Sequence, residues 1–349
     1  MATEANRPRL KSGATLADVG REAGVDQSTV SRVLSGDSRA RVTDLTRTRI
    51  KDAASKLGYV PNATARSLAT SRTSTLGLLV PNSGSLVFAN IIRGANEAAR
   101  ELGYVLVVAD ASELGHVSDA VRQLVLEGRV DGLLIASGTT SDTITDELVG
   151  SLNNCVILNR RISNRAPSII EDDEFGMYLC TKELIDAGHL RIACLAGPPD
   201  IDTSGRRIVG FRRALREAQL KLGREAIVHA PFDEAGGHAG MLKILGRKTR
   251  PTAVASTSLA MAVGAMAAAR ELGIRIPNDV SITGFHDAPI ANYLAPPLTT
   301  IAMPLAELGR QGVVMLHRRL IGEPGPLHVK VLEPRPVLIR RASVGPPPN

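Results

Sequence analysis

The sequence predicts an α/β protein in which an N-terminal three-helix domain precedes a larger, two-lobed, doubly wound body. Two observations predict this division. Before residue 75 the apolar residues recur with a helical period, whereas after it strand-like and helix-like runs alternate. Positive charge is concentrated before residue 75. Residues 1–72 hold 13 Lys and Arg residues against 7 Asp and Glu residues, a net +6, whereas the rest of the chain carries about +1. A basic head on a near-neutral body is typical of a polyanion-binding module joined to a domain of another kind.

Residues 15–34 read TLADVGREAGVDQSTVSRVL and predict two short helices joined by a tight turn. Thr15 can cap the first helix, with Asp18 in the capping-box position. Gly24 supplies the positive φ that a tight turn needs, and Asp26 can cap the second helix. Two helices joined at a glycine-containing turn form a helix-turn-helix.

The second predicted helix has an apolar stripe and a polar outward face. The stripe consists of Val30, Val33 and Leu34. The outward face consists of Gln27, Ser28, Thr29, Ser31 and Arg32. Short polar side chains and one guanidinium suit the base edges of a DNA major groove. From this stretch alone, an ordinary helical hairpin with a solvated polar face is the alternative.

The remaining part of the head contains one more helix and a weaker helical segment. Thr43 can cap a third helix that runs to Leu57 and completes a small core. Before it, a polar loop carries Arg39 and Arg41, which could contact phosphates. Residues 62–69 form a short helical candidate with hardly any apolar face, which should not be stably helical alone. This segment is either a floppy linker or one that folds on meeting DNA and a second copy. Residues 1–13 are expected to be a disordered tail.

From residue 75 onward, apolar strand-like runs alternate with helical stretches. The strand-like runs are 76–80, 105–109, 132–136, 156–158, 192–196, 253–256 and 280–284, and the helical stretches include 91–102, 175–187, 208–219 and 259–272. This βαβ order predicts parallel sheets covered on both faces. Residues 75–343 are too many for one such sheet, so we expect two lobes with a ligand-binding cleft at the carboxyl ends of the strands. Residues 344–349 are expected to be a tail.

The sequence also excludes several classes of protein. Its three cysteines are odd in number and lack CxxC spacing, so neither a disulfide scaffold nor a zinc site is expected, and a reducing cytoplasm fits. The first 13 residues contain no apolar signal sequence. Residues 251–269 are uncharged, but their Ala, Ser, Thr and Gly content favours a strand, a turn and a buried helix over a membrane span. No HExxH, GxxxxGK or GxSxG motif indicates an enzyme, and no cofactor is expected.

Five motifs in a fixed order resemble the LacI/GalR family of bacterial repressors. They are TLADVGREAGVDQSTVSRVL, LGYVPNATARSLA, LGLLVP at 76–81, DAGHLRIACLAGP at 186–198 and PPLTTI at 296–301. The resemblance extends from residue 14 to about residue 343. It implies a transcriptional regulator, usually a repressor, whose affinity for double-stranded operator DNA is controlled by a small-molecule effector. A pure solute-binding protein is the alternative, but this alternative accounts only for residues 75–343 and not for the basic N-terminal domain.

The resemblance implies roles for residues of the head. Gln27, Ser28 and Arg32 should be the main readers of base edges. Residues 61–74 should hold a hinge helix and a linker, with the helix at 62–69 ordered only as a pair on the operator. Leu68 should then enter the minor groove and kink the central step. The further DNA contacts expected are Thr15, Thr29, Ser31, Arg39, Arg41, Asn62 and Arg66. Two half-sites in a pseudo-palindromic operator require two heads, so a homodimer is implied. No heptad follows residue 343 to support a tetramer.

The resemblance likewise implies a periplasmic-binding-protein-like body behind a helix-turn-helix domain at 14–60. The chain should cross between lobes near residues 170–172, 300–304 and 320–323. The first lobe is then 75–170 plus 303–322, and the second is 171–301 plus 323–343.

The expected effector site departs from the family pattern in its charge. Arg207 keeps the family's ligand-gripping arginine three residues before Gly210, whereas His286 and Asn159 stand where sugar binders often carry aspartate. The other residues expected at the site are Phe88 and Phe232 as aromatic walls, Thr203, and Thr257 in place of a frequent asparagine. Arginine and a protonatable imidazole suit an anion, so an effector with a carboxylate or phosphate, such as a sugar acid, is the hypothesis. The alternative is that His286 hydrogen-bonds a neutral sugar or simply packs.

Overall fold

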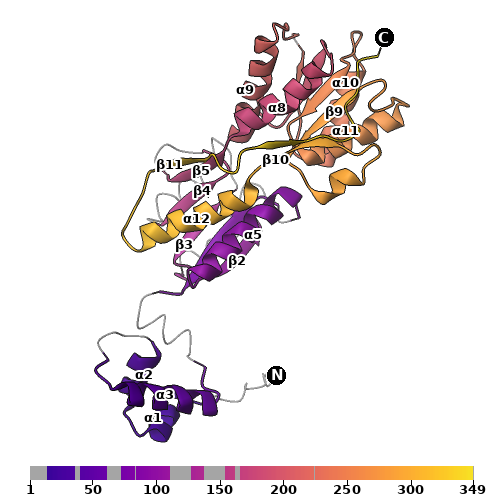
Figure 1. Ribbon diagram of the computed structural model, residues 1–349. Helices are drawn as coiled ribbons and strands as arrows, with labels where there is room; N and C mark the ends of the chain where they lie inside the picture. Colours follow the sequence, from indigo (N-terminus) through magenta and orange to yellow (C-terminus); the bar gives the residue numbers. More distant parts are fainter. Residues whose placement is uncertain are drawn as a thin grey trace, which may run out of the picture. The chain divides into compact units, whose positions relative to one another are not determined.

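A computed structural model describes residues 14–35, 40–60, 72–82, 84–110, 127–136, 154–161, 166–223 and 225–348. The chain divides into two compact units, Met1–Thr73 and Ser74–Asn349 (Figure 1). Several sequence-based expectations lie outside the described residues: the tail at 1–13, the hinge helix at 62–69, and Arg39, Asn62, Arg66 and Leu68.

The described residues of the first unit form three helices, and each begins at the predicted cap. They are α1 (Leu16–Ala23), α2 (Gln27–Leu34) and α3 (Asp44–Lys56). The capping box is confirmed, because the amide of Asp18 donates to Thr15 Oγ1 at 3.3 Å and the amide of Thr15 donates to Asp18 Oδ2 at 2.9 Å. Asp26 accepts from the amide of Ser28 at 2.8 Å, and Gly24 has a φ of 62°, both as predicted.

The three helices enclose a small apolar core. Its buried members are Val19, Ala23, Val30, Val33, Ala40, Ile50, Ala53 and Ala54. Gly20 brings α1 against the start of α2, because a Cβ at this position would lie 2.7 Å from the backbone oxygen of Val25. The short spacing between the two helices therefore depends on a residue without a side chain.

The second unit contains two six-stranded sheets, which confirms the prediction of parallel sheets in a doubly wound body. The first sheet has the order β11-β5-β4-β3-β1-β2, and all of its strand pairs are parallel. Its strands are β1 (Thr75–Val80), β2 (Val105–Asp110), β3 (Gly132–Ile135), β4 (Cys155–Leu158), β5 (Ser168–Glu171) and β11 (His328–Val331).

The second sheet has the order β12-β10-β9-β8-β6-β7 and is parallel except that β12 runs antiparallel to β10. Its strands are β6 (Ile192–Ala196), β7 (Ile227–His229), β8 (Ala253–Ser256), β9 (Ser281–Phe285), β10 (Thr299–Ala302) and β12 (Val337–Ile339). The carboxyl ends of parallel strands carry the loops that form ligand sites in such sheets, which places the candidate site at these ends.

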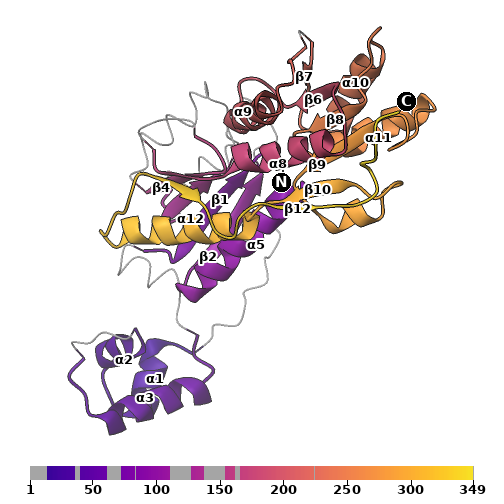
Figure 2. The ribbon, with the colours of Figure 1, turned by 45° about the horizontal axis from the view of Figure 1, so that its top comes forward.

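Helices cover both sheets. In the first lobe α5 (Leu86–Glu101) and α12 (Leu305–Leu320) run side by side (Figure 2). The second lobe has α8 (Asp173–Asp186), α9 (Asp202–Glu217), α10 (Glu234–Leu245) and α11 (Leu259–Glu271), with a short 3₁₀ helix at Pro289–Asn292. As predicted, residues 251–269 form a buried strand, a turn and most of α11. Among the described helices, none is both long and apolar enough to cross a bilayer.

The chain passes between the lobes three times. It crosses between β5 and α8 and again between β10 and α12, both near the expected positions. The prediction for the third crossing was wrong. β11 pairs with β5 of the first lobe, so the crossing lies between β11 and β12 rather than at 320–323, and residues 328–331 do not belong to the second lobe. The alternation within a short strand indicates which face is buried but not which sheet edge the strand joins.

The end of the described chain is attached to the second lobe, although residues 344–349 were expected to be a tail. The amide of Gly345 donates to Ser281 Oγ at 3.1 Å, and its carbonyl oxygen lies 2.9 Å from Nε2 of the buried His189. Val344 packs against an apolar cluster of the same lobe. This part of the carboxyl terminus is therefore part of the fold.

Candidate nucleic-acid interface and effector cleft

The exposed face of α2 contains the residues that the sequence predicted to read DNA. Gln27, Ser28, Ser31 and Arg32 are exposed and Thr29 is half-buried, whereas Val30 and Val33 on the opposite face are buried. Hydrogen bonds from Ser28 to Asp26 lower the pKa of the Asp26 carboxyl. The amide of Ser28 is therefore committed to the helix cap, where the positive end of the helix dipole also favours a carboxylate.

Two further predicted DNA contacts lie in the described part of the head. Thr15 is exposed, and its hydroxyl is held in the capping box at 2.7 Å from Asp18 Oδ2. Arg41 is exposed just before α3. An exposed arginine beside a helix that carries short polar side chains is the arrangement in which phosphate contacts orient a base-reading helix.

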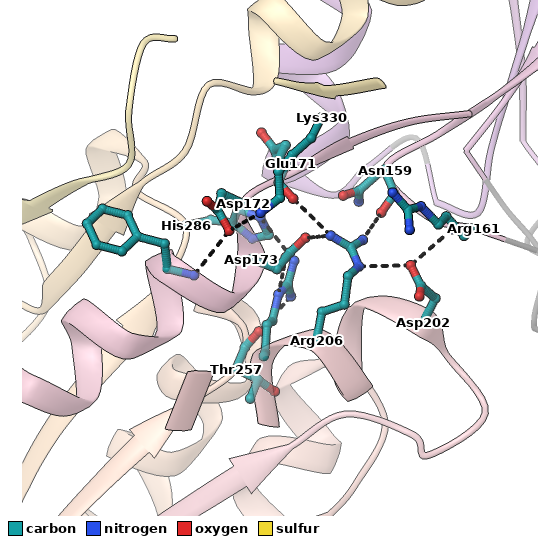
Figure 3. A network of polar contacts seen from close by, with 12 residues as sticks. Asn159, Arg161, Glu171, Asp172, Asp173, Asp202, Arg206, Thr257, His286 and Lys330 are labelled. Atoms are coloured by element: carbon teal, nitrogen blue, oxygen red, sulfur yellow. Dashed lines mark hydrogen bonds and ion pairs between the residues drawn. The ribbon is translucent and has the colours of Figure 1, made fainter. Parts of the chain in front are cut away.

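The candidate effector residues follow the ends of four strands in the second unit. Asn159 follows β4, Glu171 ends β5, Thr257 follows β8 and His286 follows β9. Figure 3 shows these four residues around a network of arginines and carboxylates from the starts of α8 and α9. Polar groups from the strand ends of both sheets therefore meet where the ligand site of such sheets is expected.

Arg207 lies at the centre of this network on α9, and only 3% of its surface is exposed. Its Nε donates to Asp173 Oδ1 at 2.7 Å and its Nη1 donates to the carbonyl oxygen of Thr257 at 2.8 Å. The guanidinium carbon also lies 4.1 Å from the ring centroid of Phe285, which is a favourable position for a cation over an aromatic face. α9 approaches α8 closely at Gly210, where a Cβ would lie 2.1 Å from the backbone oxygen of Glu174.

Asp173 balances two arginines. This residue begins α8, is fully buried, and accepts from Arg207 through Oδ1 and from Arg206 through Oδ2. Asp202 accepts from Arg206 Nε at 2.9 Å and carries a second negative charge at the same site. Two guanidinium charges are thus paired with two carboxylate charges, so the positive charge of Arg207 is compensated within the site.

His286 is a neutral imidazole in this site. Burial, and then the charge of Arg207, hold the pKa of His286 well below its usual value. Its Nε2 lies 3.4 Å from Arg207 Nη2 and must accept there, because a guanidinium only donates. The single proton of the neutral ring is then on Nδ1, which is buried and has no partner among the described residues.

Glu171 is the most perturbed acid of the cleft. It is fully buried, and neither of its carboxylate oxygens has a partner among the described residues. Burial, and then the neighbouring Asp173, raise the pKa of Glu171 to about 8, although Arg207 and Arg206 oppose the change. This carboxyl is therefore mostly protonated at neutral pH and can donate a hydrogen bond.

The remaining predicted effector residues are Asn159, Phe232, Thr257, Thr203 and Phe88. Asn159 has a buried amide oxygen without a partner among the described residues, and the ring of Phe232 lies 5.8 Å from the guanidinium carbon of Arg207. The Thr257 hydroxyl is engaged internally, since it accepts from the amide of Gly197 at 3.0 Å. Two further residues are buried: Thr203 in the first turn of α9, and Phe88 in the core of the first lobe.

Sequence reasoning did not assign the four charged residues Glu171, Asp173, Asp202 and Arg206 to the site. The signals were present as an Asp-Asp pair at the expected lobe crossing and as two consecutive arginines just before the helix predicted at 208–219. Their partners lie up to 47 residues away in sequence, however, so no local pattern could match them. Within the described ranges, no group of three or more His, Cys, Asp or Glu side chains is arranged to hold a metal ion, and the cysteines are buried and free.

Comparison with known proteins shows which family the chain resembles in its sequence. Residues 15–62 match the model described as bacterial regulatory proteins, lacI family, and residues 181–344 match the periplasmic binding protein-like domain. The ribose operon repressor of Haemophilus influenzae is 38% identical over 325 residues, which cover 93% of this chain and 97% of that protein. The chain belongs to the LacI family. This is a family of transcriptional repressors rather than enzymes.

Other LacI-family relatives match over nearly the whole chain. The HTH-type transcriptional repressor PurR of Vibrio vulnificus is 34% identical and covers 95% of this chain and 98% of its own length. The structure of the lac repressor dimer bound to operator and the anti-inducer ONPF aligns with a TM-score of 0.81 at 28% identity, covering 96% of this chain and all of the other. The structure of the transcriptional regulator CelR with cellobiose aligns with a TM-score of 0.73 at 29% identity, covering 95% and 99%. The predicted fold, a helical head and two parallel α/β lobes, is confirmed.

Proposed function

We propose that this LacI-family chain is a homodimeric repressor that reads a pseudo-palindromic operator and senses a small, neutral, hydroxyl-rich molecule between its lobes. The observation that carries the DNA part is the exposed polar face of α2 on a basic unit, with Gln27 and Arg32 both exposed. A related chain has been solved as a dimer on its operator. We place the protein in the cytoplasm with its DNA.

In this proposal the head residues have separate tasks. Gln27, Ser28 and Arg32 read base edges, and Arg41 contacts phosphate. Both the amide and the side chain of Ser28 bond to Asp26 in the helix cap, so Ser28 would contact DNA from a side chain that the cap already orients. The hinge contacts of Asn62, Arg66 and Leu68, and the phosphate contact of Arg39, remain predictions from the resemblance.

The proposed effector class differs from the anion hypothesis. That hypothesis required a free arginine charge and a protonatable imidazole, but Arg207 is paired with Asp173 and the pKa of His286 is well below its usual value. An anion would therefore enter a site whose charges are already compensated. Three groups near Arg207 are instead buried without a hydrogen-bond partner among the described residues: the Nδ1–H of His286, the amide oxygen of Asn159 and the carboxyl of Glu171. Mixed donors and acceptors of this kind suit hydroxyl groups, which both donate and accept.

The relatives support the same ligand class. The structure of CelR holds cellobiose, a neutral disaccharide, and another relative is named for a ribose operon. Repressors named PurR are also similar to this chain, so purine bases are the alternative to include in a test.

Control of DNA binding requires that the effector bind two lobe arrangements with different affinity, since a ligand with equal affinity for both shifts nothing. A typical coupling free energy of about 1–3 kcal/mol would change operator affinity by roughly 5- to 150-fold. Both directions of change satisfy this requirement, and titration of the operator complex with effector gives the direction.

The test combines operator selection with calorimetry on the full chain. Duplexes selected from a random pool should contain a palindrome, and deletion of residues 1–72 should abolish their binding but leave effector binding intact. Calorimetry should then compare neutral sugars with the aldonic acids made from the same sugars, and with purine bases. Tighter binding of the acids would contradict the neutral-effector part, and failure to select any duplex at low salt would contradict the repressor assignment.

A further inference from the structure

The first two turns of α9 in the second lobe are bonded directly to the first lobe. Nη2 of Arg206 donates to the carbonyl oxygen of Asn159 at 2.8 Å, and Oδ2 of Asp202 accepts from the amide of Arg161 at 3.0 Å. Asn159 and Arg161 belong to the segment that follows β4 of the first sheet. Figure 3 shows both bonds leaving the start of α9 for this segment. Two hydrogen bonds therefore join the lobes at one end of the cleft.

Arg206 is held in place for this contact by three other acceptors. Its Nε donates to Asp202 at 2.9 Å, and its Nη1 donates to both Asp173 and the carbonyl oxygen of Glu171. The Arg206 and Asp202 side chains are 19% and 20% exposed, so their bonds are shielded from solvent. Hydrogen bonds to ionised groups in partly buried sites are roughly twice as strong as neutral ones. The guanidinium is thus oriented before it reaches across the cleft.

Asn159 links this contact to the effector site. Its carbonyl oxygen accepts from Arg206, while its side-chain amide oxygen is buried in the cleft without a partner among the described residues. Its φ of 65° lies in the left-handed region, where asparagine is one of the few residues with a side chain that is tolerated. A ligand that hydrogen-bonds the Asn159 amide would act on the same residue that receives the bond between the lobes.

We propose that Asp202 and Arg206 form a clamp on the 159–161 segment, and that the strength of this clamp sets how readily the two lobes change their relative arrangement. The clamp consists of Asp202, Arg206, and their acceptor and donor at Asn159 and Arg161. Asp202 and Arg206 are positioning residues that act through the lobe arrangement and do not themselves need to touch the effector. That the clamp affects DNA binding rests on the proposed function. That the clamp restrains the movement of the lobes does not.

The clamp can be tested without DNA or effector by measuring the distance between the lobes in the full chain. Spin labels at Arg100→Cys on α5 and Lys243→Cys on α10 report on the first and second lobe, and both positions are exposed. The three native cysteines are buried, and burial raises the pKa of each thiol, which keeps them unreactive toward the label. Double electron–electron resonance spectroscopy then gives the distribution of distances between the two labels.

Two clamp variants and one matched control are compared in the labelled background. Arg206→Gln removes the cation, and Asp202→Asn weakens the clamp while leaving Asp173 paired with both arginines. The control is Arg213→Gln, which removes arginine–carboxylate pairs with Glu217 on the same helix and with Glu174 on α8, both of which lie within the second lobe. We expect both clamp variants to broaden or shift the distance distribution and the control to match the parent.

Each outcome decides the proposal. A distribution unchanged in Asp202→Asn and in Arg206→Gln overturns the clamp, even if either variant lowers the melting temperature, because the contact is then only structural. If Arg206→Gln fails to fold, Asp202→Asn alone decides. Operator binding measured on the same samples separates the two proposals: a failed clamp with intact operator binding leaves the proposed function standing, whereas a broadened distribution without operator binding supports only the clamp.

Discussion

Nε of Arg207 donates to Oδ1 of Asp173 at 2.7 Å, and the two side chains are only 4% and 0% exposed. This buried ion pair joins the first turn of α8 to the second turn of α9 and places a compensated charge at the candidate effector site. The net value of such a pair relative to an apolar one is small, but breaking it by removing one partner leaves an unpaired buried charge. We therefore expect the pair to contribute to the stability of the second lobe, and in the proposed function it favours a neutral ligand over an anion.

Asp173→Asn should destabilise the second unit by about 3–5 kcal/mol, because it leaves the buried Arg207 without its carboxylate. Urea unfolding of the full chain measures this loss. Asp186→Asn on the same helix is the matched control, since Asp186 pairs with Lys182 at 2.6 Å in an exposed position, where ion pairs contribute about 0–1 kcal/mol. Equal effects of the two substitutions would show that the pair at Asp173 is not energetically special.

Glu171→Gln should remove a dependence of stability on pH. The pKa of Glu171 is raised from 4.5 to about 8, so the folded state binds more protons than the unfolded state between these values. Stability should therefore fall with rising pH across this window by about 1.4 kcal/mol per pH unit for one proton, and become constant above it. Unfolding of parent and variant from about pH 4 to 9, which brackets this window, measures the difference. A variant curve parallel to the parent curve would contradict the assignment.

Gly20→Ala should destabilise the head by about 1–3 kcal/mol, the usual range for overpacking, because its Cβ would meet the backbone oxygen of Val25 at 2.7 Å. Backbone atoms at this helix junction cannot move aside as a flexible side chain could. Thermal unfolding of the head, followed by circular dichroism, measures the effect. Ala17→Leu on the exposed side of α1 adds more volume without crowding and should change stability by less than about 0.5 kcal/mol.

Gln27→Ala and Arg41→Ala should weaken DNA binding in different ways if α2 reads the major groove. Loss of Gln27 should relax the sequence preference at one position by about 1–3 kcal/mol. Loss of Arg41 should weaken all duplexes alike and reduce the slope of log affinity against log salt by roughly one. Binding to the selected operator and to single-base variants at several salt concentrations separates these effects. Identical behaviour of the two variants would show that the groove assignment is mistaken.

Local features of this chain were predictable from its sequence. The caps at Thr15, Asp26 and Thr43 and the left-handed Gly24 all involve residues within a few positions of one another, so the sequence contains both partners of each interaction. The alternation of strands and helices in the body was also predictable, because the period of the apolar residues is a property of the sequence. The family was predictable because its motifs occur in a fixed order along the chain.

The charge state of the cleft was not predictable in the same way. His286 and Arg207 read as two positive groups in sequence, and only the fold places Asp173 beside Arg207 and removes His286 from solvent. The third lobe crossing was misplaced for a related reason, since the pairing of β11 with β5 brings His328 beside Ser168, which lies 160 positions earlier in the chain.

The sequence by itself thus determined the helix-turn-helix, the alternation of strands and helices in the body, and the places of Asn159, Thr257 and His286 after predicted strands. The strands β5, β7, β10, β11 and β12 were not among those expected. The tertiary structure alone decided which of the site residues are charged, which are compensated and which bonds cross between the lobes. The physical reason is that helix caps and the spacing of apolar residues depend on residues that are close together in the chain. Desolvation and ion pairing depend on groups that folding brings together from distant positions.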